Sequence, residues 1–329
     1  MIYGVPLRRA RAVTYLATAA RVGVSALLLL LISRFLDVGD VLGKLRDLSV
    51  WWVLLGLGIS TLQVVLLAWR WSFTAERVGV RLSLSQAWRE YYISLFLNQV
   101  LPGGVGGDVA RAWRHARTSA PAGPSVRAVI LERASGQLVM TLVACASMIV
   151  LFLPSTGSAT SWGSSGLIAV IALVGPATVI ISHRSLRRLA LSESAPNGPG
   201  STSLHSRVGA DVYRAVLSRD ALPFQLVSAA LLVGSYIAVY LVAARAIGVN
   251  TEVLQLLPLI APVLMTMLIP VSIAGWGVRE GAAAALWGMA GLTPEDGVAI
   301  SVAYGLLILI ASAPGAFVLL SHRGRSEMP

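Results

Sequence analysis

The chain has little charge and almost no cysteine. Only 12% of its 329 residues are charged, 56% are hydrophobic, and the mean hydropathy is +0.76. Soluble domains carry about twice that charged fraction. The one cysteine, Cys145, lies in an apolar run, so it excludes an internal disulfide and offers no redox or metal argument. We therefore predict an all-α polytopic membrane protein.

Several motifs of known chemistry are also missing. The four histidines, at positions 115, 183, 205 and 322, have no ligand-like spacing, so we expect no metal site and no cofactor. The sequence has no Walker motif for ATP hydrolysis and no Asp-x-Asp of a sugar-nucleotide enzyme, so we expect no enzyme activity. The formal net charge of +11 comes from arginines in short loops between apolar runs. That pattern is typical of positive-inside topology, and we expect no nucleic-acid partner.

Windows of about 19 residues predict about six spanning helices. They lie near residues 13–36, 50–71, 127–153, 166–182, 223–247 and 297–320. Arginines before the first span and after the last predict a multi-pass protein of the cytoplasmic membrane with both termini in the cytoplasm. Residues 183–222 combine six arginines with a Ser/Pro/Gly-rich run. We interpret them as a flexible cytoplasmic loop between two membrane halves, residues 1–182 and 223–329.

A glycine-rich break interrupts the first half, where residues 97–114 read LNQVLPGGVGGDVARAWR. Such backbone leaves amide N–H groups uncovered, and a helix that starts after it points its positive end at an anion. The preceding apolar stretch, residues 91–101, is too short to span, which predicts a re-entrant element that enters from the cytoplasm. The candidate binding residues are Asn98, Gly103, Gly104, Gly106, Gly107, Asp108 and Arg111. Asp108 and Arg111 are three residues apart on one helical face and could also pair with each other.

A second break occupies residues 268–282, LIPVSIAGWGVREGA, with Gly275, Gly277, Arg279 and Glu280 as candidates. Pro270 follows Pro102 by 168 residues (270 minus 102), about half the chain. The predicted topology brings this break in from the outer face. Interrupted segments at matching places in two oppositely oriented halves indicate an inverted-repeat transporter. Because Arg279 and Glu280 are adjacent, we expect their side chains to diverge and to find partners elsewhere.

One further arginine, Arg70, lies between two tryptophans at the end of the second predicted span. The position is typical of an interfacial anchor, although a guanidinium there could also bind lipid phosphate.

Together these motifs resemble the lysylphosphatidylglycerol synthase transmembrane family. The resemblance rests on Asn98, on Pro-Gly-Gly-x-Gly-Gly-Asp with the following Arg111, on a Glu-Arg-x-x-Gly motif, and on Gly-x-Gly-Val-Arg-Glu-Gly at residues 275–281. It covers nearly the whole chain and adds Glu132, Arg133 and Gly136 to the candidates. Where many members have consecutive glycines in the second break, this chain has Ile273, Ala274 and Gly275.

In bifunctional members the region is a flippase for aminoacylated phospholipid, fused to a soluble aminoacyl transferase. No such domain follows Pro329, so we expect no lysylphosphatidylglycerol synthesis. The resemblance implies a flippase or transporter that moves an anionic lipid or polyprenyl-linked glycolipid headgroup, with a membrane lipid as its partner. Glycine amides, a helix N-terminus and Arg111 or Arg279 would hold the headgroup. Two alternatives remain: an accessory subunit beside a lipid-biosynthesis enzyme, and a polyprenyl-phosphate glycosyltransferase. The sequence specifies no oligomeric state.

Overall fold

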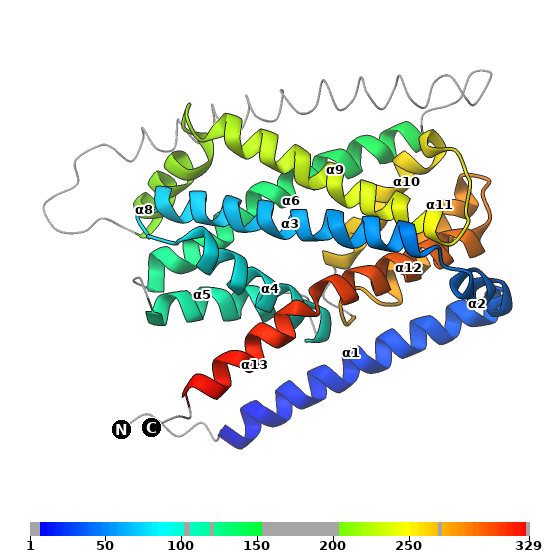
Figure 1. The fold of residues 1–329 in the computed structure, drawn as a ribbon, viewed down its shortest axis with the longest axis horizontal. Coiled ribbons are helices and arrows are strands. Elements are labelled where there is room, and N and C mark those ends of the chain that lie inside the picture. The colour runs from blue at the N-terminus through cyan, green and yellow to red at the C-terminus, as the bar shows by residue number, and fades with distance from the viewer. Residues whose placement is uncertain (1–6, 102–105, 119–121, 153–203, 269–271, 327–329) are drawn as a thin grey trace, which may run out of the picture.

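The computed structural model describes residues 7–101, 106–118, 122–152, 204–268 and 272–326, which fold into helices (Figure 1). The candidates Gly103 and Gly104, the predicted span at 166–182 and most of the predicted loop at 183–222 lie outside these residues. The helices are α1 (Leu7–Phe35), α2 (Val38–Arg46), α3 (Val50–Arg77), α4 (Leu84–Val100), α5 (Gly106–Thr118), α6 (Ala122–Phe152), α8 (Leu204–Val212), η1 (Tyr213–Leu217), α9 (Leu222–Ala246), α10 (Val253–Met265), η2 (Thr266–Leu268), α11 (Val278–Met289), α12 (Pro294–Ser312) and α13 (Pro314–Ser326).

Four of these helical stretches are long and apolar enough to cross a membrane. They are Val50–Arg77, Ala122–Leu151, Leu222–Ala246 and Pro294–Ser321, and the bent pair α1 and α2 could add a fifth. Each of the four coincides with a predicted span. The chain is thus an all-α, multi-pass membrane protein, and the described residues account for four or five of the six predicted spans.

Helix α2 is joined by an ion pair to α12, which lies near the other end of the sequence. Asp37 caps its start by accepting hydrogen bonds from the amides of Gly39 and Asp40. The Nζ of Lys44 then lies 2.6 Å from carboxylate oxygens of both Asp40 and Asp296, the latter in the first turn of α12. The amino group of Lys44 therefore joins α2 to α12 through two carboxylates.

The same order of elements occurs twice: a long helix, a short helix, a break, a second short helix and another long helix. The first set is α3 to α6 and the second is α9 to α12. In α10, Pro258 and Pro262 interrupt the backbone hydrogen bonds within the helix.

The two sets run in opposite directions. The amide of Ser49, before α3, donates to the carbonyl of Ala246 at the end of α9 over 2.8 Å. At the other end of the pair, the rings of Phe73 and Phe224 stack with centroids 4.0 Å apart. Helices α3 and α9 are therefore antiparallel neighbours at the centre of the molecule (Figure 1).

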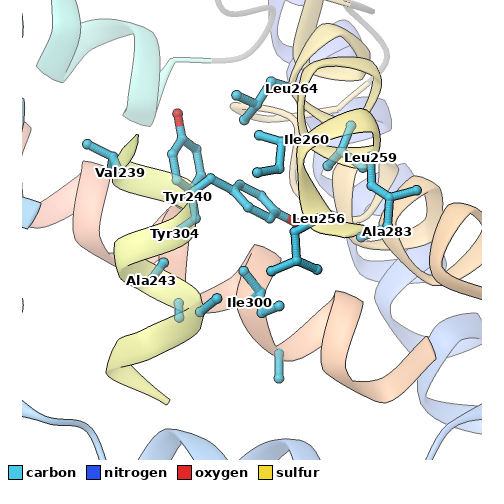
Figure 2. Packing of buried hydrophobic residues seen from close by; sticks show 14 of the residues in the cluster. Val239, Tyr240, Ala243, Leu256, Leu259, Ile260, Leu264, Ala283, Ile300 and Tyr304 are labelled. Carbon is cyan, nitrogen blue, oxygen red and sulfur yellow. The ribbon is translucent and has the colours of Figure 1, made fainter. Parts of the chain in front are cut away.

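The larger apolar core lies in the second set. Figure 2 shows Tyr240 of α9 beside Tyr304 of α12, with Leu256 and Ile260 of α10 next to them. The two tyrosine rings have centroids 5.4 Å apart. A second cluster surrounds the fully buried Trp71 and joins α3 to α4, α5 and α6. The helices that flank the first break thus pack on the Trp71 cluster, and those that flank the second break pack on the Tyr240 cluster.

The first short helix of each set also packs against the last long helix of the opposite set. Helix α10 lies on α6, and α4 lies on α12 and α13. The second contact depends on Gly315, because a methyl group there would collide with the carbonyl oxygen of Tyr92. The two halves are therefore interlocked around their breaks.

Part of the stretch predicted as a flexible loop is ordered helix. Residues 204–217 form α8 and η1, in which Ala215 and Leu217 are buried. Asp211 fixes this segment to α6, because its carboxylate lies 2.6 Å from the guanidinium of Arg127. The Ser/Pro/Gly-rich composition therefore does not describe the whole of residues 183–222.

We expect Gly315→Ala to lower the free energy of unfolding by about 1–3 kcal/mol, because the added methyl group pushes α13 away from α4. Thermal unfolding of the detergent-solubilised protein measures the change. The matched control is Gly58→Ala in α3, where the methyl group meets open space. Equal melting temperatures for the two variants would contradict the close packing of α13 on α4.

Candidate functional site

The first break joins two antiparallel helices. Near the break, Asn98 of α4 donates to Asp108 of α5, and farther away the carboxylate of Glu90 lies 2.6 Å from the guanidinium of Arg114. The helices approach closely because Gly107 has no side chain, and any Cβ there would collide with the carbonyl of Ser94. This hairpin fixes the start of α5 beside the end of α4.

A buried ion-pair cluster lies at the start of α5. The side chain of Arg111 is fully buried, with Nη2 2.7 Å from Oε2 of Glu132 and Nε 3.2 Å from Oδ1 of Asp108. Tyr91 donates to the same Glu132 oxygen over 2.6 Å, and its ring lies 4.1 Å from the Arg111 guanidinium carbon. The ring of Trp71 covers Arg111 at 4.7 Å. Cation–π contacts and two carboxylates thus replace the water that this guanidinium lacks.

Arg133 is the more accessible arginine of this cluster. Its Nη2 lies 2.6 Å from Oδ2 of Asp108, and its side chain is 35% exposed, against 0% for Arg111. Asp108 therefore pairs with both arginines: with Arg111, which is buried, and with Arg133, which is partly exposed.

The second break has comparable chemistry at the start of α11. Gly277 has a φ of 85°, a conformation that favours glycine, and its amide donates to Oε2 of Glu280 over 2.6 Å. The other Glu280 oxygen lies 2.6 Å from Nη2 of Arg279 and also accepts from the hydroxyl of Ser301. The expectation that Arg279 and Glu280 diverge is wrong, because the long arginine side chain folds back to the carboxylate fixed beside it.

The arginine of the second break is held on all sides. Its Nε donates to Ser301 over 2.8 Å, and its guanidinium carbon lies 5.2 Å from the ring centre of Trp276 and 5.5 Å from that of Tyr304. A Cβ at Gly305 would collide with Nη2 of Arg279. Among the described residues no ion pair joins this cluster to the first one.

Glycine amides at both breaks are already occupied by the protein itself. The amide of Gly107 donates to Oδ1 of Asn98 over 2.8 Å, and that of Gly277 donates to Glu280. At these two amides, side-chain oxygens take the place that the sequence suggested for a bound anion. Arg133, 35% exposed, is the most accessible arginine of the ion-pair cluster at the first break.

A cavity of about 220 Å³ lies between the two breaks. Asn98 and Gln99, at the end of α4, bound it on the side of the first break, and Met267, Leu268 and Ala274 bound it on the side of the second. Glu132, Arg133, Gly136 and Gln137 of α6 form a polar wall, and Leu264 and Met265 of α10 and Tyr304 and Ile308 of α12 also line the cavity. The cavity is therefore amphipathic, with charge next to the first break and largely apolar groups next to the second.

Arg70 is neither an interfacial anchor nor a cavity-lining group. It is fully buried and donates to the carbonyl of Gln225 and to the hydroxyls of Ser228 and Ser135. The predicted anchor role is wrong, because the residue joins α3, α6 and α9 inside the protein. No carboxylate pairs with it among the described residues. A methyl group at Gly136, on the cavity wall, would lie 3.7 Å from its Nη2.

The structure brings the predicted residues into two groups. Asn98, Gly106, Gly107, Asp108, Arg111, Glu132 and Arg133 gather at the first break, and Gly275, Gly277, Arg279 and Glu280 gather at the second. The pairing of Asp108 with Arg111 is confirmed. Within the described ranges, no three His, Cys, Asp or Glu side chains are placed to hold a metal ion.

Sequence reasoning missed Tyr91, Ser94 and Ser301. The first two share one face of α4 with Asn98, at spacings of three and four residues, so a polar stripe was available as a signal. Ser301 is one of two serines in an apolar helix, and no local pattern distinguishes it from Ser312.

The chain belongs to the family described as "Lysylphosphatidylglycerol synthase TM region", whose sequence pattern matches residues 18–315. A search of curated proteins and one of solved structures gave no significant match.

We expect Glu132→Gln to lower the free energy of unfolding by about 3 kcal/mol, because Arg111 then keeps a buried charge with one carboxylate at 3.2 Å. Thermal unfolding in detergent measures the loss. Glu90→Gln is the matched control, since it breaks a partly exposed pair with Arg114 and should cost about 1 kcal/mol or less. A loss for Glu132→Gln no larger than that of the control would contradict the buried cluster.

Proposed function

We propose that this member of the lysylphosphatidylglycerol synthase TM region family is a flippase that moves an anionic lipid headgroup across the cytoplasmic membrane. The observation that carries the proposal is one cavity bounded by both breaks, with Asn98 and Gln99 at one side and Met267 and Ala274 at the other. Broken helices that meet at a central site are the usual architecture of transporters built from inverted repeats. An accessory subunit has no need of such a cavity.

The charge around the cavity supports an anionic headgroup. Arg111 and Arg133 balance the two carboxylates, Asp108 and Glu132. Arg70 lies behind the cavity wall, where its Nη2 is 3.7 Å from the position of a Cβ at Gly136, and it adds one positive charge in excess. Charges in a low-dielectric wall act strongly on a nearby ion. A phosphate that enters the cavity replaces part of the pairing between Asp108 and Arg133, whose side chain is already partly exposed.

The size and polarity of the cavity support a lipid rather than a water-soluble anion. Its volume of about 220 Å³ is below the range of about 300–1,000 Å³ that encloses a drug-sized ligand. The cavity therefore holds a headgroup, while the acyl or prenyl chains stay outside. The apolar side, with Met265, Met267 and Leu268, suits the first carbons of those chains.

The repeat supports alternating access. Positions that line the cavity recur at the spacing of the two prolines, 168 residues: Val64 with Leu232, Gln99 with Met267, Gly136 with Tyr304, and Met140 with Ile308. Since α3 and α9 are antiparallel, such pairs face the cavity from opposite directions. Rocking of one half against the other would open the headgroup site first to one side and then to the other.

Translocation in reconstituted vesicles tests the proposal. Fluorescent phosphatidylglycerol and a fluorescent polyprenyl phosphate are the anionic probes, phosphatidylcholine is the zwitterionic probe, and external dithionite reports the lipid that reaches the outer leaflet. We expect Arg133→Gln to slow an anionic lipid about tenfold, because one charged hydrogen bond to the phosphate is lost. Arg133→Lys should keep a larger share of the rate.

The matched control is Arg214→Gln. Like Arg133→Gln, it removes an arginine paired with an aspartate, here Asp211 at 2.7 Å, but on the surface and away from the cavity. It should translocate like the wild type. Rates equal to protein-free vesicles for every probe would refute flipping of these lipids. Equal rates for Arg133→Gln and Arg214→Gln would refute the role of Arg133, and equal rates for all three lipids would refute anion selectivity.

A further inference from the structure

A second hollow lies at the open end of the first hairpin, where α4 begins and α5 ends. Its volume is about 520 Å³, and it shares no lining residue with the central cavity. We call it the basal groove. It is lined by Ser83, Ser85, Gln86, Arg89, Glu90, Trp113, Arg114 and Arg117.

The basal groove is positively charged. It contains three arginines and one carboxylate, and the carboxylate of Glu90 is already paired with Arg114 at 2.6 Å. Arg89 and Arg117 therefore supply two positive charges beyond that pair. Arg117 is held in place, because its guanidinium carbon lies 3.9 Å from the ring centre of Trp113. Such a stacked guanidinium keeps its N–H donors free to contact a phosphate.

The groove lies at the level of a membrane interface. Trp69 near the end of α3, Trp88 near the start of α4 and Trp113 near the end of α5 are 51%, 40% and 54% exposed, respectively. The 78–83 connection joins the end of α3 to the start of α4, and the ion pair of Glu90 with Arg114 places the end of α5 beside them, so the three helix ends lie together (Figure 1). Exposed tryptophans at one level are typical of the headgroup region of a bilayer.

One face of α5 shows the direction in which the groove opens. Val109, Trp113 and Arg117 follow each other at intervals of four residues, so they lie along one side of the helix. Val109 is 66% exposed, which suits contact with acyl chains, and Arg117 ends the stripe with a charge. An arginine at the end of a lipid-facing stripe extends toward the headgroups. The groove therefore opens toward lipid rather than toward a soluble partner.

We propose that the basal groove binds the phosphate of an anionic phospholipid in the leaflet next to the open end of the first hairpin. Arg89 and Arg117 hold the phosphate, the serines at the start of α4 donate hydrogen bonds to it, and Trp113 contacts the glycerol and upper acyl region. The site does not depend on translocation, so it stands or falls separately from the proposed flippase activity.

Lipid retention by the full chain, measured by native mass spectrometry, tests this site. The detergent-solubilised protein is titrated with phosphatidylglycerol and, separately, with phosphatidylcholine of the same chains. We expect the wild type to prefer phosphatidylglycerol, and Arg89→Gln and Arg117→Gln each to weaken that preference about tenfold. Arg89→Gln and Arg117→Gln are also made in an Arg133→Gln background, which weakens the central site; the same further loss of about tenfold there separates the basal groove from the central cavity.

The matched control is Arg219→Gln, which removes an exposed arginine outside the groove. It should bind like the wild type. Equal retention of the two lipids, or equal effects of Arg117→Gln and Arg219→Gln, would overturn the proposal. Displacement of the lipid by inorganic phosphate at a similar concentration would show a site for free anions instead. Binding of an acidic peptide without any lipid preference would show a protein-docking surface.

Discussion

An arginine inside a membrane protein must find carboxylates, hydrogen-bond acceptors or aromatic faces within the protein, because lipid supplies none. Arg70, Arg111 and Arg279 are each 1% exposed or less, and each meets this need in a different way. Arg111 uses two carboxylates and two rings, Arg279 uses the adjacent glutamate, and Arg70 uses hydroxyls and a carbonyl. The close helix packing around the breaks supplies these partners to the buried arginines.

The close packing explains the glycines better than free amides do. Gly107 lets α5 approach the carbonyl of Ser94, and Gly305 leaves room for the guanidinium of Arg279. The sequence predicted flexible backbone open to an anion, yet the amides of Gly107 and Gly277 are held by Asn98 and Glu280. At these two positions, a ligand therefore competes with side chains that the protein already holds.

Much of the fold follows from local chemistry in the sequence. Apolar length predicts the long helices, and proline combined with several glycines within a few residues predicts both breaks, whereas Pro258 and Pro262, which have no glycine beside them, lie inside α10. The pairing of Asp108 with Arg111 follows from helical spacing alone. The partners of Arg70 could not be predicted, since they come from α6 and α9, distant in sequence. The Arg279 contact with Glu280 also depends on tertiary packing, because Trp276 and Tyr304 direct the side chain back along α11.

The two halves differ where a lipid transporter needs them to differ. Arg111 and Arg279 are 168 residues apart (279 minus 111), so each half places an arginine at the start of its second short helix. At the same spacing, however, Gln99 is matched by Met267, and the two charged residues that line the cavity, Glu132 and Arg133, both come from the first half, which makes the cavity polar toward one half and largely apolar toward the other. A symmetric cavity would suit a symmetric ligand. In the proposed flippase, an amphiphile enters with its headgroup toward Arg133 and its chains toward the methionines, so the divergence of the repeats orients the lipid as it crosses.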